Sequence, residues 1–317
     1  MHGTMPMTCP ACDESADAGL RGLAEVWDVG LSFLRCDQCK ALRLPPMRQI
    51  KASVETDIQK GDSRVMDALF QLRWRWLTAQ LPMLRDRSVR ILDMGCGDGQ
   101  FLVFLRHQGY AKVMGLEPES ARRANAVQRG VAVVAEMDEL PAGRFDVIFL
   151  WHVLEHVNAP LAFLGALRTK LAPGGTIIVS IPNHGGWQTR LFGRYASFLD
   201  YGRHVWYWDS VLITVLRAHW RKDRVEFLRG RNFEYEIFGW VDTLAGGMTR
   251  SANFVHSRLK KNIPGVGGRM AALVLSGLLL PMAWILSLIV PPSQGGVLTF
   301  TLTPQEERIS DRSGGSA

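Results

Sequence analysis

The segment VRILDMGCGDGQFL, residues 89–102, joins a short apolar strand to a helix through a turn that contains three glycines. Gly95, Gly97 and Gly99 occupy alternate positions in this turn. A residue without a Cβ atom adopts left-handed backbone conformations and lets a ligand come close to the peptide groups. The pattern therefore predicts a ligand-binding turn between a buried strand and the helix after it.

The chain around this turn alternates between segments with strand-like and helix-like patterns. A helix is expected over 159–171, and Pro173, Gly174 and Gly175 are expected to end it with a turn. The alternation predicts a parallel sheet with helices on both faces. The expected strands are 89–92, 112–116, 131–135, 145–150, 176–180 and, as the last one, 295–302.

Composition limits the class of protein and its partners. The chain has 317 residues, of which 47% are hydrophobic and 21% charged, so it can bury a sizeable core. Its formal net charge of +7 favours anionic partners, with a solvated basic surface as the alternative. The first 20 residues lack a basic start followed by an apolar run, so the cytoplasm is the expected location.

Four of the five cysteines form two C-x-x-C pairs, CPAC and CDQC. In a reducing compartment two such pairs supply four thiolates to a tetrahedral zinc ion, which then has no open position for catalysis. We therefore expect a structural Zn²⁺ bound by Cys9, Cys12, Cys36 and Cys39, with redox-active or unpaired thiols as the alternative. Cys96, inside the glycine turn, is expected to be a small packing residue.

The residues around the glycine turn indicate which ligand it binds. A nicotinamide dinucleotide site normally has the spacing G-x-G-x-x-G, but Gln100 occupies the position of the third glycine. A phosphate-binding loop would need a Lys-Ser or Lys-Thr pair, which is missing here. Asp93 precedes the turn, and Glu117 follows the second expected strand. Two carboxylates at strand ends suit a ligand with an ammonium group and a ribose diol, such as S-adenosylmethionine.

The segment 89–183 resembles the core of class I S-adenosylmethionine-dependent methyltransferases in four motifs that occur in the same order, ILDMGCGDG, GLEP, FDVIFLWHVLEHV and LAPGGTIIVSIPN. The resemblance implies an α/β, doubly wound (Rossmann-like) sheet of seven strands that binds S-adenosylmethionine. The implied cofactor contacts are Asp93, Gly95, Gly97 and Gly99 for the methionine part, Glu117 for the ribose, Glu136 and Met137 (with Asp138 as a rival) for the adenine, and Trp151 for the adenine or the core.

The chain is also similar to bacterial methyltransferases of sugar and cell-surface polysaccharide pathways, through its cysteine-rich start and the segment FGRYASFLDYGRHVWYWDSVLITVL. A hydroxyl or carbon acceptor needs a base, and histidine has an unperturbed pKa of ~6.5. The resemblance favours His204, whereas the strand ends favour His152, His156 and His184. We rank His204 and His156 first as catalytic residues, with a structural role as the alternative for each.

Residues 270–290, MAALVLSGLLLPMAWILSLIV, contain no charge and are long enough to cross a bilayer core of ~30 Å. A single crossing would leave the expected strand 295–302 on the wrong side of the membrane. We therefore expect an in-plane or re-entrant element that is broken at Pro281 and flanked by the basic stretch SRLKKNIPGVGGR. A buried pair of core or dimer helices is the alternative.

These features divide the chain into six expected segments and predict its function. We expect a methyltransferase that acts on a hydroxyl or carbon of a saccharide or lipid-linked precursor at the cytoplasmic membrane face. An RNA methyltransferase and a non-catalytic membrane-associated scaffold are the alternatives. The segments are a zinc ribbon (1–45), a helical connector (46–88), a cofactor-binding core (89–237), an insertion with hydrophobic helices (238–294), the last sheet strand (295–304) and a disordered tail (305–317).

Overall fold

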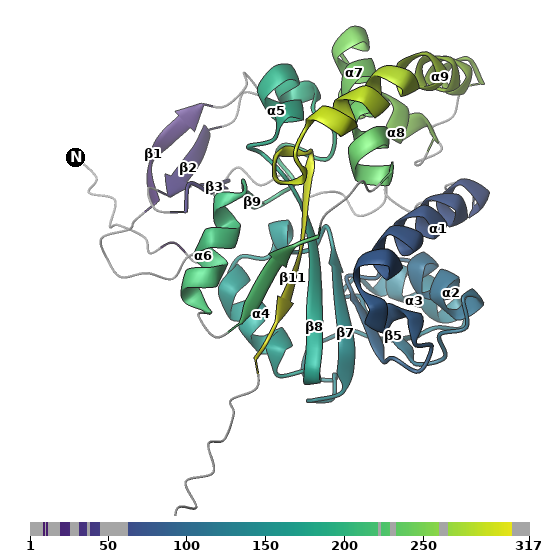
Figure 1. Cartoon of the computed structure of the whole chain (residues 1–317), viewed down its shortest axis with the longest axis vertical. Helices are drawn as coiled ribbons and strands as arrows, with labels where there is room; N and C mark the ends of the chain where they lie inside the picture. Colours follow the sequence, from purple (N-terminus) through teal and green to yellow (C-terminus); the bar gives the residue numbers. More distant parts are fainter. Residues whose placement is uncertain are drawn as a thin grey trace, which may run out of the picture.

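The computed structural model describes residues 9, 11, 20–25, 32–36, 39–44, 63–220, 223–228, 233–259 and 266–305. The strands of its central sheet are β4 (Ile91–Met94), β5 (Val113–Leu116), β6 (Ala132–Val134), β7 (Phe145–Trp151), β8 (Leu171–Pro182), β10 (Arg224–Phe227) and β11 (Val297–Thr303). Their order in the seven-stranded sheet is β10-β11-β8-β7-β4-β5-β6 (Figure 1). Strands β4 to β8 are parallel, whereas β11 is antiparallel to both of its neighbours.

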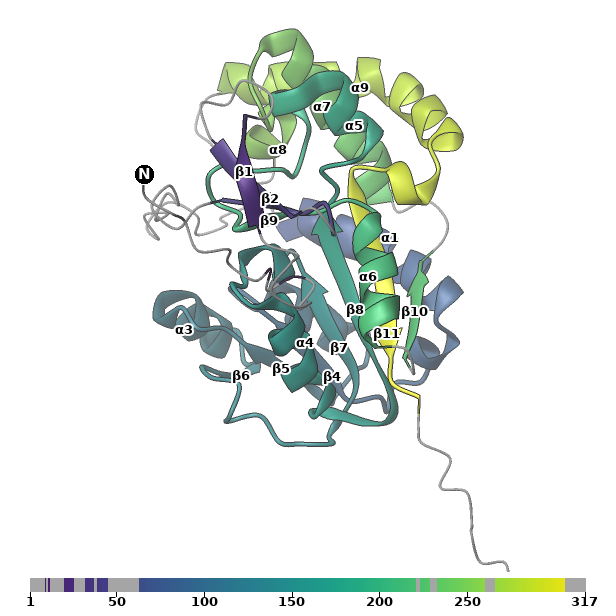
Figure 2. The ribbon, with the colours of Figure 1, turned by 90° about the vertical axis from the view of Figure 1, so that its left-hand side faces the viewer.

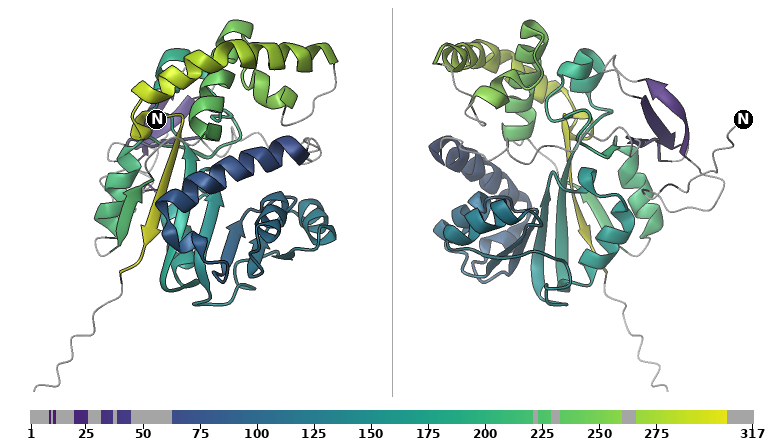
Figure 3. Two further views of the ribbon diagram at one scale, coloured as in Figure 1. Left: turned by 45° about the vertical axis from the view of Figure 1, so that its right-hand side comes forward. Right: turned by 180° about the vertical axis from the view of Figure 1, so that it is seen from behind.

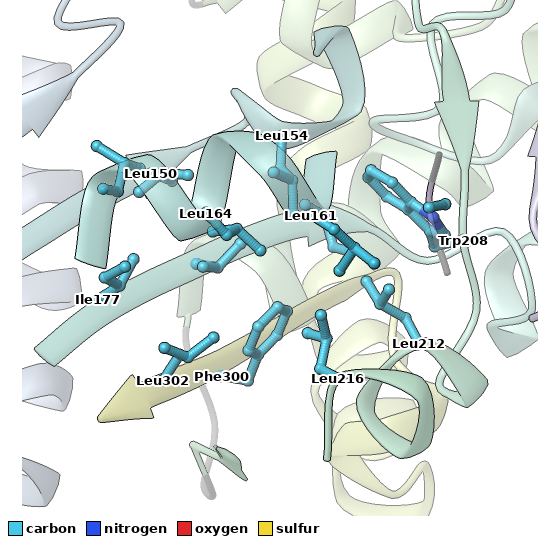
Figure 4. Packing of buried hydrophobic residues seen from close by; sticks show 14 of the residues in the cluster. Leu150, Leu154, Leu161, Leu164, Ile177, Trp208, Leu212, Leu216, Phe300 and Leu302 are labelled. Atoms are coloured by element: carbon cyan, nitrogen blue, oxygen red, sulfur yellow. The ribbon is translucent and has the colours of Figure 1, made fainter. Parts of the chain in front are cut away.

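Helices cover both faces of this sheet, because successive strand residues point to opposite faces and both sets are apolar. On β7, Phe149 packs with α1, α2 and α3, whereas Ile148 and Leu150 pack with α4 and α6. Figure 2 shows α4 and α6 in front of the sheet and α1 behind it. Figure 4 shows the second face, where leucines of α4 and α6 meet Phe300 and Leu302 of β11. This confirms the expected Rossmann-like sheet of seven strands. The helices are α1 (Ser63–Gln80), α2 (Gln100–His107), α3 (Ser120–Gln128), α4 (Pro160–Arg168) and α6 (Val211–His219).

The prediction that Pro173 to Gly175 form a turn between a helix and the next strand is wrong, because these residues lie inside β8. Phe145 of β7 pairs with Leu171, but the next pair joins Val147 to Thr176. Residues 172–175 therefore bulge out of the ladder, which places a turn-like sequence within one strand.

A second, antiparallel sheet holds the start of the chain against the rest of the molecule. It consists of β1 (Leu20–Glu25), β2 (Ser32–Cys36), β3 (Leu42–Arg43) and β9 (Trp206–Tyr207). Strand β9 comes from the segment after β8, and it pairs with β3. The segment before residue 45 is therefore joined to the following part of the chain by a shared sheet.

The remaining helices form a layer at the carboxyl ends of the parallel strands, which we call the cap (Figures 1 and 3). The cap has its own core, which includes Trp240, Leu244 and Val255. Helix α9 runs through Pro281, so the expected break there is wrong. Leu279 and Ala283 are buried on either side of the proline, and this packing holds the helix continuous against a cost of ~3 kcal/mol. The cap comprises α5 (Trp187–Phe192), η5 (Gly193–Tyr195), the π-helix η6 (Phe233–Phe238), α7 (Gly239–Thr249), α8 (Phe254–Leu259) and α9 (Val266–Ile289).

Candidate active site

A cavity of about 390 Å³ lies between the carboxyl ends of β4 and β7 and the cap. Its walls come from α1, the glycine turn, the short 3-10 helix η4 (Leu154–His156), the segment 198–204 and the cap residues Tyr235 and His256. The carboxyl ends of parallel strands are where ligands bind in open α/β sheets. The cavity is therefore the candidate active site.

The three glycines of the turn have different roles. All three have a left-handed backbone, with φ values of 65° at Gly95, 56° at Gly97 and 74° at Gly99. A Cβ atom on Gly97 would meet only the end of the Arg122 side chain, at 3.9 Å, so the backbone there is open to a ligand. Gly99 does not line the cavity; a Cβ there would lie 2.9 Å from the Cβ of Ala126. Gly95 and Gly97 thus form the cavity wall, and Gly99 lets α2 pack closely on α3.

Asp93 ends up buried at the base of the turn, with only 3% of its surface exposed. Burial raises the pKa of this carboxyl group to about 7, the charge of Arg73 opposes the rise, and the charge of Glu117 adds to it. Ionising Asp93 in the folded protein therefore costs free energy unless a cation besides Arg73 lies nearby. A cationic ligand in the cavity would remove this cost.

Glu117 joins the end of β5 to the glycine turn. Its Oε2 accepts the backbone N–H of Gly97 at 2.9 Å, and its Oε1 accepts that of Glu119 at 3.0 Å. Each carboxylate oxygen has two lone pairs, so both oxygens can accept a further hydrogen bond from a ligand. Glu117 does not itself line the cavity and meets its wall through the hydrogen bond to Gly97. Its role as the acceptor of a ribose diol stays a prediction.

Arg73 of α1 lines the cavity, and the sequence analysis did not identify it as a site residue. Its Nε donates a hydrogen bond of 2.9 Å to Oε2 of Glu234 in the π-helix, 161 residues away. Its guanidinium also lies over the ring of Trp151, 4.5 Å from the centroid. Trp151 in turn stacks on Phe149, so it is both a cavity residue and part of the core. No local pattern around Arg73 marks it as a site residue.

Three histidines surround the buried carboxylate of Glu155. His152 Nδ1 lies 3.1 Å from Glu155 Oε1, and ligand atoms of Glu155, His156 and His204 all lie within 4.8 Å of one another. The rings of His156 and His204 meet edge to face, with centroids 4.8 Å apart. Burial opposes ionisation of Glu155, but the hydrogen bond with His152 and the nearby imidazoles outweigh it and lower the pKa. This His–Glu cluster can stabilise a proton placed on one of its imidazoles.

The two histidines that we ranked first both line the cavity, together with His152. Burial lowers the pKa of His204 to about 3, so this ring is neutral at physiological pH. Its Nδ1 is buried without a hydrogen-bond partner among the described residues. His156 is exposed, whereas His204 is only 5% exposed. His156 is therefore the more accessible of the two.

Backbone strain is concentrated around the cavity. Four non-glycine residues that line it have a left-handed backbone, and they are His152 (φ 54°), Phe198 (φ 70°), Asp200 (φ 37°) and Asn253 (φ 53°). A left-handed conformation costs such residues roughly 1–2 kcal/mol each. Strain of this kind clusters at functional sites, where it fixes the direction of side chains.

Several residues expected at the site do not line this cavity. Glu136 is exposed, Met137 packs against the α4 and α6 side of the core, and neither lines the cavity. Their segment is held locally, because Glu139 Oε1 accepts the backbone N–H of Glu136 at 2.8 Å. His184 also lies outside the cavity, next to Tyr207. The sequence pattern was loosest at Glu136, and the cavity does not extend there.

The described cysteines at the start of the chain lie together. The thiols of Cys9, Cys36 and Cys39 are within 4.8 Å of one another and are buried. Cys12 lies outside the described residues. Cys96 is in the cavity wall, and burial raises the pKa of its thiol, which keeps it protonated and a poor nucleophile.

Comparison with known proteins agrees with this geometry. A methyltransferase-domain family matches residues 66–216, which contain most of α1, the glycine turn, Glu117 and the His–Glu cluster. A tRNA U34 carboxymethyltransferase from Pseudoalteromonas translucida is 29% identical over 159 residues, which cover 46% of this chain and 48% of the relative. A ubiquinone biosynthesis O-methyltransferase from Nitrosococcus oceani is 38% identical over 135 residues, which cover 39% of this chain and 56% of the relative. The chain thus spans about half the length of these curated relatives.

Solved structures include chains with a similar fold. A SAM-dependent methyltransferase from Archaeoglobus fulgidus aligns with 77% of this chain and 95% of its own, with a TM-score of 0.43 and 14% sequence identity. The family match, the order of the motifs and the sheet with its glycine turn and carboxylates agree with one another. Residues 66–216 match a methyltransferase-domain family, and the sheet has the Rossmann-like fold of class I S-adenosylmethionine-dependent methyltransferases.

Proposed function

We propose that this protein transfers a methyl group from S-adenosylmethionine to a hydroxyl group of a lipid-linked precursor. The observation that carries the proposal is that one cavity joins two different sets of groups. The glycine turn with Asp93 supplies one side, backed by Glu117 through its hydrogen bond to Gly97, and the His–Glu cluster supplies the other. The first set suits the cofactor, and the second suits removal of a proton from the acceptor.

The residues of the first set fit the cofactor. Gly97 leaves open space at the backbone, Asp93 would hold the ammonium group, and Glu117 would accept the ribose hydroxyls. Trp151 lines the same cavity, where Phe149 stacks on its ring and the guanidinium of Arg73 lies over it. When bound, the cofactor supplies an electrophilic methyl group, so the protein has to align and deprotonate the acceptor.

The second set is proposed to work as a general base. His156, the exposed imidazole of the His–Glu cluster, would accept the hydroxyl proton of the acceptor. Glu155 would then stabilise the resulting imidazolium, because its carboxylate is buried and ionised beside the ring. His204 would stay neutral and fix the position of His156 by ring contact. A non-catalytic scaffold would have no use for these groups in one cavity.

The class of acceptor is supported by two observations. The relative from Nitrosococcus oceani is named as an O-methyltransferase of ubiquinone biosynthesis, which points to a hydroxyl on a lipid-linked molecule. The cavity also carries the aromatic rings of Tyr235 from the cap and Phe198 from the segment 198–204. A saccharide in the acceptor is supported only by the sequence resemblance of the segment 192–216.

RNA is the second candidate substrate. The relative from Pseudoalteromonas translucida is named as a tRNA U34 carboxymethyltransferase, and the net charge of +7 favours a polyanion. Salt-sensitive binding of tRNA, followed by methyl incorporation into it, would replace the lipid-linked acceptor in this proposal.

We also propose that the N-terminal cysteines bind a structural zinc ion. The Sγ atoms of Cys9 and Cys39 are 3.8 Å apart, the edge length of a tetrahedron with Zn–S bonds of ~2.3 Å. The backbone N–H of Cys39 donates to Sγ of Cys36 at 3.5 Å, which stabilises a thiolate. Cys12 would supply the fourth ligand, as the C-x-x-C spacing predicts.

The experiment that tests the activity measures transfer of a labelled methyl group to hydroxylated polyprenyl phenols, to lipid-linked saccharides and to tRNA. The matched variants are Glu155→Gln and Glu139→Gln, because Glu139 is an exposed carboxylate outside the cavity. We expect transfer to a lipid-linked hydroxyl, its loss in Glu155→Gln and normal rates in Glu139→Gln. Equal rates in both variants would contradict the role of the His–Glu cluster.

A further inference from the structure

Helix α9 carries most of the exposed large apolar side chains in the described part of the chain. Ten of the fourteen such side chains belong to α9, including Leu278, which is 72% exposed, and Trp284, which is 51% exposed. Every residue that is exposed within 267–289 is apolar. The helix is also long and apolar enough to cross a membrane, by length and composition alone. A surface of this kind marks an interaction site.

We infer that α9 lies flat in the interface of an anionic lipid bilayer and holds the cap on the membrane. This inference deepens the proposed function, because it brings the cavity to the surface that contains a lipid-linked acceptor. The test below measures membrane binding without cofactor or acceptor, so it can fail or succeed independently of methyl transfer.

The attachment of α9 to the cap favours the flat orientation over a crossing. The buried residues Ala272, Leu279 and Ala283 of α9, and Val290 directly after it, recur at helical spacing in the core shared with α7 and α8. This buried stripe runs along a helix about 36 Å long. Figure 3 shows the yellow-green helix α9 lying across the other cap helices. Crossing a bilayer would remove the whole stripe from its partners, whereas lying flat leaves it in place.

Both ends of α9 are also held on the same body of the protein. Near its start, Gly268 lies against the side chain of Arg258 in α8. After its end, the side chain of Asn183 donates hydrogen bonds to the carbonyl oxygens of Ser293 and Gly295, just before β11 enters the sheet. The helix therefore begins and ends on one side of any membrane that it contacts.

Charge complementarity favours an anionic bilayer as the partner of the exposed surface of α9. Between residues 239 and 305 the sequence contains five Lys or Arg residues and a single acidic residue, Asp242, which is fully buried. Arg250, Arg258 and Arg269, one on or beside each of α7, α8 and α9, are at least partly exposed. Basic side chains next to an apolar helix add attraction to anionic headgroups. The two serines of α9 bond to backbone carbonyls of their own helix, so they need no water.

The cap also connects this surface to the cavity. In α8, Phe254 and Val255 are buried in the core shared with α9, while His256 lines the cavity. Asp242 of α7 fixes the start of α8, because its Oδ1 accepts the backbone N–H groups of Val255 and His256 at 2.7 and 3.0 Å. An acceptor with its head group in the cavity would thus keep its lipid part near the bilayer that α9 contacts.

The test is flotation of the full-length protein with vesicles of equal parts phosphatidylcholine and phosphatidylglycerol, and with phosphatidylcholine alone. Val274 on α9 and Val127 on α3 are both 55% exposed, so Val274→Glu and Val127→Glu make the same change on the two surfaces. We expect the original protein and Val127→Glu to float with anionic vesicles. Val274→Glu should lower the bound-to-free ratio about tenfold, with unchanged thermal unfolding and unchanged S-adenosylmethionine binding.

Other results would overturn the inference. Failure of the original protein to float, or equal flotation of both variants, would show that α9 does not bind lipid. The original protein could instead form a dimer without lipid that Val274→Glu dissociates, while flotation is unchanged. That result would assign the exposed surface of α9 to contact with a second copy of the chain. Retention on the vesicles after an alkaline carbonate wash would contradict the flat orientation, because a flat helix is released by it. Flotation without S-adenosylmethionine binding would instead count against the proposed function alone.

Discussion

Replacing Asp93 with asparagine should make the ligand-free protein more stable at neutral and alkaline pH. The pKa of Asp93 is about 7 in the folded protein because the group is buried. In the unfolded chain it would be about 3.9. The folded state therefore binds one proton more than the unfolded state between these values, so the free energy of unfolding falls as pH rises through this window.

The size of the effect follows from the same two pKa values. Between pH 5 and pH 8 the native carboxyl group loses its proton while the unfolded one is already ionised, which removes about 3 kcal/mol of stability. An asparagine side chain does not titrate, so the Asp93→Asn variant should lack this loss. From pH 5 to pH 8 the free energy of unfolding of the variant should therefore rise by about 3 kcal/mol relative to that of the original protein.

The assay is urea unfolding of both proteins at a series of pH values, without ligand. The same pair of proteins should show the opposite order in cofactor binding, because only an ionised Asp93 attracts the ammonium group. Affinity of the original protein for S-adenosylmethionine should weaken by up to about tenfold per pH unit below 7, and the variant should lack this dependence. Parallel curves of stability against pH for the two proteins would refute the reasoning.

Three further predictions follow from the site and the N-terminal sheet. Glu155→Gln should lower kcat by roughly 10²-fold or more with normal S-adenosylmethionine binding, as measured by steady-state kinetics and titration, because it removes the charge that stabilises the imidazolium. Gly99→Ala should lower the free energy of unfolding by about 2 kcal/mol in urea, because the new Cβ has no space. Gly97→Ala has space for its Cβ, so it should lower the free energy of unfolding by only about 1 kcal/mol and chiefly weaken cofactor binding. Cys39→Ser should remove the zinc found by metal analysis and lower the Tm, and an unchanged metal content would exclude the proposed ligand set.

The residues that directly follow strands were the predictable part of the site. Asp93, Glu117 and His156 come at or just after the ends of β4, β5 and β7, and the carboxyl ends of neighbouring parallel strands meet at one edge of a sheet. A strand pattern therefore fixes both the position of these side chains and their proximity. Glu136 is exposed and does not line the cavity, so its contact with the adenine stays a prediction.

The part of the site that the cap contributes could not be predicted. Arg73 and Glu234 are 161 residues apart and meet only because α1 and the π-helix η6 pack against each other beside the cavity. Such a contact leaves no periodicity in either segment. The continuity of α9 through Pro281 was missed for a related reason, since the burial of Leu279 and Ala283 by other helices outweighs the local preference of proline.

The measurement that tests the central claim most directly is calorimetric titration of the folded protein with S-adenosylmethionine and its demethylated product, compared with Glu117→Gln. We predict micromolar binding by the original protein and binding at least about tenfold weaker in the variant, which loses a charged acceptor of the ribose hydroxyls. The variant should keep the same far-UV circular dichroism. No binding by the folded original protein, or equal binding by both, would contradict the assignment of this cavity to the cofactor.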